Sequence, residues 1–153
     1  MSTKIDNKNP LDGYKVVDFS AVFAGPICSR FLLDCGAEVI KVETPKVGDF
    51  TRGIGGITPV FAHFNAGKRS IAVDLKNPSG QELVRELIID ADIVIENFRP
   101  GIMSKFGLDY ESLKNLIWSI VQFPALVSQA LMSAALRSHL LFMQQAVLTV
   151  PIH

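Results

Sequence analysis

The chain has 153 residues, enough for one domain with a buried core. Basic and acidic residues number 15 each, so no net charge favours nucleic acid or an anionic membrane surface. Cys28 and Cys35 are too few and too close for a disulfide framework, and no Cys/His spacing predicts a zinc site. The polar N-terminus lacks an apolar signal segment. We therefore expect a cytoplasmic protein without a bound metal.

The first part of the chain predicts strands that alternate with helices. Residues 1–9 are expected to form a disordered lead-in, followed by a first strand at Tyr14–Phe19. Pro26 suits the first turn of a helix, and Gly36 suits its C-terminal end. A second strand is expected at Glu38–Val42.

The alternation continues after a loop rich in glycine, proline and threonine at 43–59. The expected elements are a strand at Ser70–Leu75, a helix capped by Asn77, a strand at Ala91–Ile95, and short helices beginning at Pro100 and Asp109. Strands joined to helices by short connections indicate an α/β fold with a mostly parallel, doubly wound sheet. Such sheets present ligand-binding groups at the carboxyl ends of their strands.

Basic residues cluster around the third and fourth predicted strands. They are Lys68 and Arg69 before the third strand, Lys76 after it, and Arg99 and Lys105 after the fourth. Arginine and lysine are the side chains that bind phosphate groups, as a fork of donors and as a compact charge. Asn97 and Phe98 add an amide and an aromatic face, which suit an adenine or a pantetheine amide. Ordinary solvated side chains at loop ends are the alternative interpretation.

Four carboxylates lie at or near predicted strand ends: Asp18, Glu43, Asp74 and Glu96. Asp18 and Asp74 are expected to cap or brace the neighbouring loops. Nothing in the local pattern identifies any of the four as a nucleophile. The sequence therefore predicts a binding edge without assigning a catalytic residue.

The composition changes after Asn115. The stretch Leu116–Val150 is apolar and contains no acidic residue, since Glu111 is the last acid of the chain. A membrane span needs about 20 apolar residues, and the uncharged run Leu116–Leu136 reaches that length, although serine and glutamine dilute it. An amphipathic helix is the second interpretation. The third, which we favour, is a tail that was never selected as protein.

The ordered set of motifs closely resembles the amino-terminal part of the class III coenzyme A transferases, the family that also includes the α-methylacyl-CoA racemases. The resemblance covers residues 10 to 115 and rests on the following segments: Pro10–Gly13, Val16–Ser20, Ala24–Pro26, Gly36–Glu43, Gly48–Asp49, Thr51–Arg52, Lys68–Ile71, Asp74–Lys76, Glu96–Gly101 and Gly107–Leu108.

The resemblance implies that coenzyme A, or an acyl-CoA, lies across the strand ends. The implied contacts are Ala24 near the thioester, Val73 as an apolar contact, and Lys76, Asn97, Phe98 and Lys105 on the coenzyme, with Arg99 as a helper. Some relatives carry a basic residue for the phosphates at the position of Thr44, so the resemblance predicts that this phosphate contact is weaker here or is supplied by another residue. The family forms interlocked homodimers, and an unfinished sheet such as this one puts that pairing in doubt.

Transferases of this family use an aspartate that attacks an acyl-CoA thioester and then forms an aspartyl-CoA intermediate. That aspartate lies several tens of residues beyond the matching segment, in a region where this chain has no acidic residue. The resemblance therefore implies a truncated and inactive transferase. A racemase fragment and a non-catalytic CoA-binding module remain as alternatives.

Relatives continue after the helix at Asp109 with a strand similar to Leu-Val-Tyr-Cys-Ser-Ile-Ser-Gly-Phe-Gly. A DNA sequence that encodes Ile117, Trp118 and the residues after them can also be read in a shifted frame that starts at the third base of the Ile117 codon. With allowed codons, this shifted frame encodes that same relative-like sequence. We therefore expect three regions: the lead-in, a coenzyme-binding part at 10–116, and an out-of-frame tail at 117–153.

Overall fold

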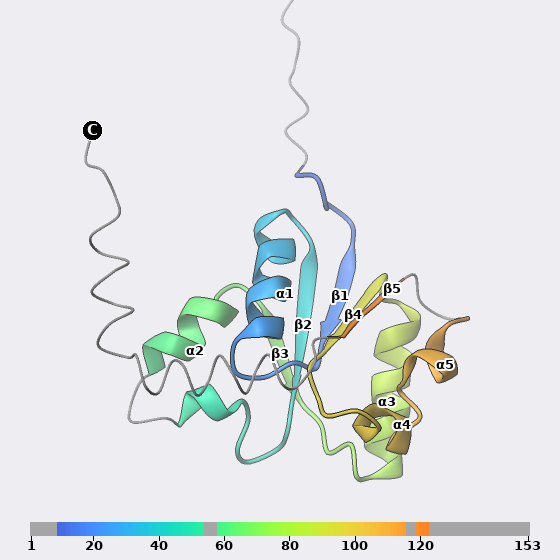
Figure 1. The fold of residues 1–153 in the computed structure, drawn as a ribbon. Helices are drawn as coiled ribbons and strands as arrows, with labels where there is room; N and C mark the ends of the chain where they lie inside the picture. The colour runs from blue at the N-terminus through green and yellow to red at the C-terminus, as the bar shows by residue number, and fades with distance from the viewer. Residues whose placement is uncertain (1–8, 54–57, 116–118, 123–153) are drawn as a thin grey trace, which may run out of the picture.

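The computed structural model describes residues 9–53, 58–115 and 119–122. Five parallel strands form one sheet in the order β3-β2-β1-β4-β5 (Figure 1). The strands are β1 Lys15–Asp18, β2 Glu38–Glu43, β3 Arg69–Ala72, β4 Ile93–Glu96 and β5 Ser119–Gln122. The predicted α/β fold with a parallel, Rossmann-like sheet is therefore confirmed.

Helices connect each strand to the next. They are α1 Ala24–Asp34, the 3-10 helix η1 Phe50–Arg52, α2 Thr58–Asn65, α3 Pro78–Ile89, α4 Ile102–Lys105 and α5 Tyr110–Leu113. The predicted cap of α3 is present, because Ser79 N–H donates to Asn77 Oδ1 at 3.0 Å. Asp109 is the N-cap of α5, as predicted.

The central strands contribute to a buried cluster on each face of the sheet, because successive strand residues point to opposite sides. On one face, Val16 and Ile95 pack with Leu32 of α1. On the other, Val17 packs in a cluster that includes Ile88 of α3. This two-sided burial explains the apolar runs of the central strands β1 and β4.

The order of strands reverses between β1 and β4. The chain runs from β1 to β2 and β3 on one side, and then returns to place β4 and β5 on the other side of β1. The carboxyl ends of the strands lie at the lower edge of the sheet in Figure 1. A reversal of this kind opens a crevice at the carboxyl ends of the two central strands, where open α/β sheets bind ligands.

The predictions missed three elements. The 3-10 helix η1 lies within the predicted loop at 43–59, α2 begins at the end of that loop, and β5 lies within the stretch that was assigned to the tail. β5 pairs with β4, with Val94 opposite Ile120 and Ile95 opposite Val121. Residues 1–8 and 123–153, including most of the predicted tail, lie outside the described residues. Within the described part, no helix is long and apolar enough to cross a bilayer.

Candidate functional site

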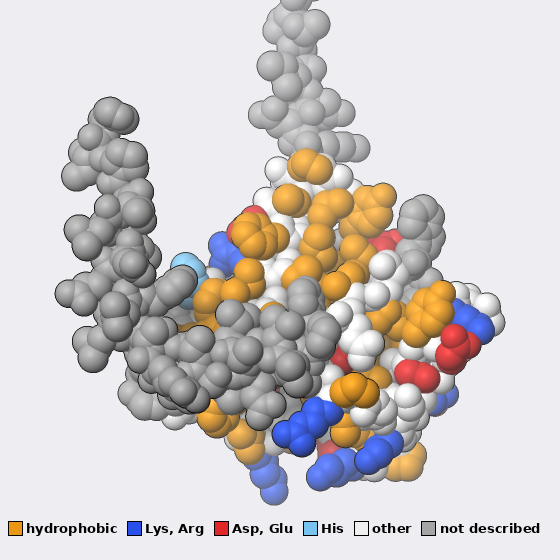
Figure 2. Space-filling model, in the orientation of Figure 1, with side chains coloured by type: hydrophobic (Ala, Val, Ile, Leu, Met, Phe, Trp, Pro, Cys, Tyr) orange, Lys and Arg blue, Asp and Glu red, His pale blue; other side chains and the backbone are white. Residues whose placement is uncertain are grey.

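Seven of the eight residues that the resemblance predicts follow the carboxyl end of a strand or begin the next helix, and the eighth lies at the end of a short helix. Thr44 follows β2, Val73 and Lys76 follow β3, Asn97, Phe98 and Arg99 follow β4, Ala24 begins α1, and Lys105 ends α4. Thr44, Lys76, Arg99 and Lys105 are exposed, whereas Val73 is buried. Figure 2 shows basic side chains gathered along the lower margin of the molecule, at the carboxyl edge of the sheet.

Asn97 joins the ends of the two central strands. Its Oδ1 accepts a hydrogen bond from Ala21 N–H at 2.9 Å, and its Nδ2 donates to the Ala21 carbonyl at 2.7 Å. Ala21 lies in the loop between β1 and α1, and Asn97 directly follows β4. The side chain of Asn97 therefore links the end of β4 to the loop after β1 at the point where the strand order reverses.

Asp18, at the end of β1, forms a buried ion pair with Lys68. Asp18 Oδ2 lies 3.1 Å from Lys68 Nζ, and the two side chains are 0% and 1% exposed. Lys68 Nζ also donates to Ser29 Oγ at 2.7 Å and to Asn65 Oδ1 at 2.9 Å. Burial lowers the pKa of Lys68, and the charge of Asp18 opposes that shift. Asp18 thus braces the surrounding loops, as predicted.

A second buried ion pair, between Lys41 and Asp49, lies on the neighbouring strand β2. The Lys41 Nζ to Asp49 Oδ2 distance is 3.0 Å. Lys41 Nζ also donates to the Ser20 carbonyl at 2.6 Å, and Thr51 N–H donates to Asp49 Oδ1 at 2.9 Å. Burial would raise the pKa of Asp49, but the charge of Lys41 and the bonds from Thr51 outweigh it and lower that pKa.

Glu43, the last residue of β2, is the centre of a third cluster. Arg52 binds both of its oxygens, with Nε to Oε2 at 2.7 Å and Nη2 to Oε1 at 2.6 Å. Ser70 Oγ donates at 2.5 Å and Asp49 N–H at 2.8 Å. Burial opposes ionisation, but these donors outweigh it and hold the pKa of Glu43 at about 2. The Arg52 guanidinium also lies over the Phe61 ring, 3.6 Å from its centroid.

The basic residues expected at the site therefore divide into two groups. Lys68 pairs with Asp18, and Arg69 forms an ion pair with Glu38, so both are bound by carboxylates of the chain. Lys76, Arg99 and Lys105 are exposed along the carboxyl edge. The sequence prediction placed these residues only by their position next to a strand. It could not distinguish the paired cations from the exposed ones, because each ion pair is formed with a residue distant in sequence.

The remaining carboxylates near the edge are also engaged. Glu96 is buried and accepts a hydrogen bond from Phe98 N–H at 2.7 Å, and burial raises its pKa. Asp74 accepts from Lys76 N–H at 3.0 Å and braces that turn, as predicted. These contacts assign structural roles to the carboxylates that lie at strand ends.

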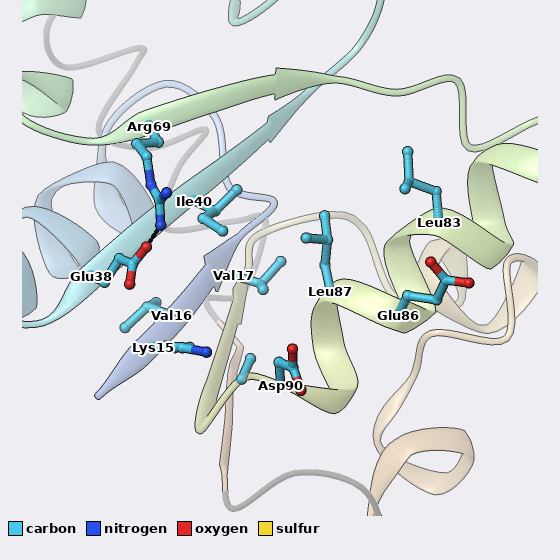
Figure 3. Close-up of a pocket in the computed structure, with 11 residues that line it drawn as sticks. Lys15, Val16, Val17, Glu38, Ile40, Arg69, Leu83, Glu86, Leu87 and Asp90 are labelled. Carbon is cyan, nitrogen blue, oxygen red and sulfur yellow. Dashed lines mark ion pairs between the residues drawn. The ribbon is translucent and has the colours of Figure 1, made fainter. Parts of the chain in front are cut away.

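A cavity of about 300 Å³ lies elsewhere, between α3 and the face of β1, β2 and β3 (Figure 3). Leu83 and Leu87 of α3 face Val17 and Ile40 of the sheet across it. Charged side chains surround it, among them the ion pair of Arg69 and Glu38. Its lining includes none of the eight predicted residues. We therefore place the candidate site at the carboxyl edge rather than in this cavity.

A sequence profile described as CoA-transferase family III matches residues 11–124. The chain belongs to CoA-transferase family III. The match extends past the expected boundary at residue 116 and includes β5.

Relatives and solved structures agree with this assignment. A succinate–glutarate CoA-transferase of Agrobacterium fabrum is 45% identical over 127 residues, covering 76% of this chain and 32% of that protein. A formyl-CoA:oxalate CoA-transferase of Rhodopseudomonas palustris is 43% identical, covering 69% of this chain and 26% of that protein.

Among solved structures, a CAIB/BAIF family protein from Brucella suis is 46% identical with a TM-score of 0.66, covering 75% of this chain and 32% of that one. Rv3272 from M. tuberculosis is 40% identical with a TM-score of 0.69, covering 74% and 32%. The chain therefore spans about a third of the length of the relatives it matches.

The Glu43 cluster predicts a pH-dependent stability. The pKa of Glu43 is about 2 in the folded chain and 4.5 for an ordinary glutamate. Its ionised carboxylate therefore contributes its full stabilisation above pH 4.5, and this contribution is lost as pH falls from 4.5 towards 2. At about 1.4 kcal/mol per pKa unit, the contribution is at most about 3 kcal/mol. Glu43→Gln should lower the free energy of unfolding at pH 7 and flatten its fall on acidification, as measured by urea denaturation.

Glu82→Gln, at an exposed position of α3, is the matched control, because it removes a carboxylate outside this cluster. Its stability should follow that of the wild type at each pH. An equal change in both variants, or an unchanged acid profile in Glu43→Gln, would contradict the role assigned to the cluster.

Proposed function

We propose that this chain is the coenzyme A-binding part of a family III CoA-transferase. In the complete enzymes, CoA moves between an acyl-CoA and a carboxylic acid through an aspartyl-CoA thioester. The observation that carries the proposal is that seven of the eight expected residues follow the carboxyl ends of β2, β3 and β4 or begin α1, the helix that follows β1.

The charge distribution supports phosphate binding at this edge. Lys76, Arg99 and Lys105 are exposed there, and cations of this kind bind phosphate through charge-assisted hydrogen bonds. Helix α1 begins at the same edge, and Phe23 at its N-cap position provides no side-chain capping bond. The positive end of the helix dipole therefore favours negative charge at this edge. Phe98, half-buried beside Asn97, supplies an aromatic surface for the adenine or pantetheine portion.

We infer that the chain alone binds the coenzyme without transferring it. The carboxylates near the edge hold loops and cations of the fold, and the chain contains no acid beyond Glu111. The attacking aspartate would belong to the part of the relatives that has no counterpart here.

We also propose that residues from about 117 onward are translated from a shifted reading frame of a longer transferase gene. The short strand β5 is compatible with this origin, because Ile120 and Val121 favour a strand whatever frame produced them. Sequencing the parent DNA tests the proposal. An uninterrupted frame encoding Leu-Val-Tyr-Cys-Ser-Ile-Ser-Gly supports it, and the absence of any open alternative frame contradicts it.

The binding function predicts a measurable affinity for free coenzyme A. Isothermal titration should show saturable binding, and Lys76→Ala, Arg99→Ala and Lys105→Ala should each weaken it by about 3- to 10-fold, as expected for loss of one charge-assisted contact. Lys15→Ala is the control, since Lys15 is an exposed cation at the opposite end of β1.

Circular dichroism of each variant would verify that the fold is retained. A folded chain that does not bind coenzyme A, or an equal loss of affinity in Lys15→Ala, would contradict the proposed function. Exchange of CoA between acyl-CoA and a free acid by the isolated chain would contradict the inference that it lacks the attacking group. Exchange of an α-proton on an acyl-CoA would instead favour a racemase.

A further inference from the structure

The two hydrogen bonds between Asn97 and Ala21 reproduce the pairing of two backbone residues in a sheet. One carboxamide edge satisfies both the N–H and the carbonyl of Ala21, at 2.9 and 2.7 Å. The two residues lie 76 positions apart in sequence. This contact therefore fixes the loop after β1 relative to the end of β4, across the reversal of strand order.

The rest of the β1–α1 loop is held by side chains from other elements. Ser20 N–H donates to Asp18 Oδ1 at 2.9 Å, and Lys41 Nζ donates to the Ser20 carbonyl at 2.6 Å. Val22 has a φ of 73°, a backbone conformation that β-branched residues rarely adopt, and its N–H lies 3.4 Å from Asp49 Oδ1. Such a conformation persists only where the surroundings determine it.

The loop also packs directly on the first turn of α1. A Cβ atom at Gly25 would overlap the Cβ and Oγ atoms of Ser20, so backbone and loop are in close contact there. A displacement of the loop would therefore change the position of the α1 N-terminus. From the β4 side, Phe19 N–H donates to the Ile95 carbonyl at 2.8 Å where the loop begins, and Asn97 holds the loop two residues further on, at Ala21.

We propose that Asn97 is a positioning residue, which holds the β1–α1 loop and the start of α1 in the geometry that receives the coenzyme. This inference rests on the proposed function. In this role the Asn97 carboxamide is hydrogen-bonded to Ala21, whereas in a direct binding role it would contact the coenzyme itself. Arg99, two residues further on, acts on the ligand by its charge and has no part in holding the loop.

Asn97→Asp tests the inference. The carboxylate keeps an acceptor for Ala21 N–H but places a second oxygen against the Ala21 carbonyl. At pH 7 and without ligand, hydrogen exchange of the Ala21 amide, measured by NMR, should be at least about 10-fold faster than in the wild type. The reason is that the hydrogen bond of this amide no longer persists. Affinity for coenzyme A should fall by about 10-fold, the effect of losing one or two buried hydrogen bonds. Both should recover as pH is lowered through the pKa of the new carboxyl, about 4 for an ordinary aspartate, since a protonated carboxyl donates again, with the wild type measured at each pH.

Asn97→Ala removes both hydrogen bonds without adding a charge, and it should give the same two losses without recovery at low pH. Arg99→Ala should weaken binding while Ala21 keeps its protection. Reduced affinity in the Asn97 variants with full Ala21 protection would overturn the inference in favour of direct contact, and so would unchanged affinity. If the wild-type chain does not bind coenzyme A, the proposed function fails, and the protection of Ala21 still reports whether Asn97 holds the loop.

Discussion

The buried ion pair of Asp18 and Lys68 joins the end of β1 to the segment that leads into β3, and the carboxyl edge is built on this contact. Ions removed from water are costly unless their remaining hydrogen-bonding groups are satisfied. Ser29 and Asn65 meet that requirement around Lys68, and Ser20 donates to Asp18. Loss of one partner would leave an uncompensated charge, at a cost of about 3 to 5 kcal/mol.

The charged residues of this chain therefore act at two levels. Those beneath the edge, Asp18 with Lys68 and Lys41 with Asp49, are almost fully buried and determine the shape of the loops. Those on the rim are exposed and available to a ligand. A rigid lower layer limits the reorganisation needed when an anionic ligand binds, which preserves affinity. Asn97 belongs to the lower layer by its contacts, although it lies beside the rim residues Phe98 and Arg99.

The sequence predicted which strands end at the carboxyl edge of the sheet, because the features that mark strand and helix ends are local. Strand-length apolar runs, the cap at Asn77 and the turn after β4 all depend on neighbouring residues, and these expectations agree with the structure. Contacts between distant residues were not accessible in this way. Lys68 and Lys76 both flank β3, yet one is buried against Asp18 and the other is exposed. The pairing of Asn97 with Ala21 has no periodic signature. β5 was missed because the apolar stretch after Asn115 was assigned to a tail outside the fold.

The location of the ligand is the most direct test of this account. The backbone amide resonances of the folded chain, followed by NMR during titration with coenzyme A, distinguish the carboxyl edge from the cavity beside α3. The account predicts that the perturbed amides lie after β1, β3 and β4, around Ala21, Lys76 and Phe98. Perturbation centred instead on the cavity lined by Val17, Ile40 and Leu87 would contradict it.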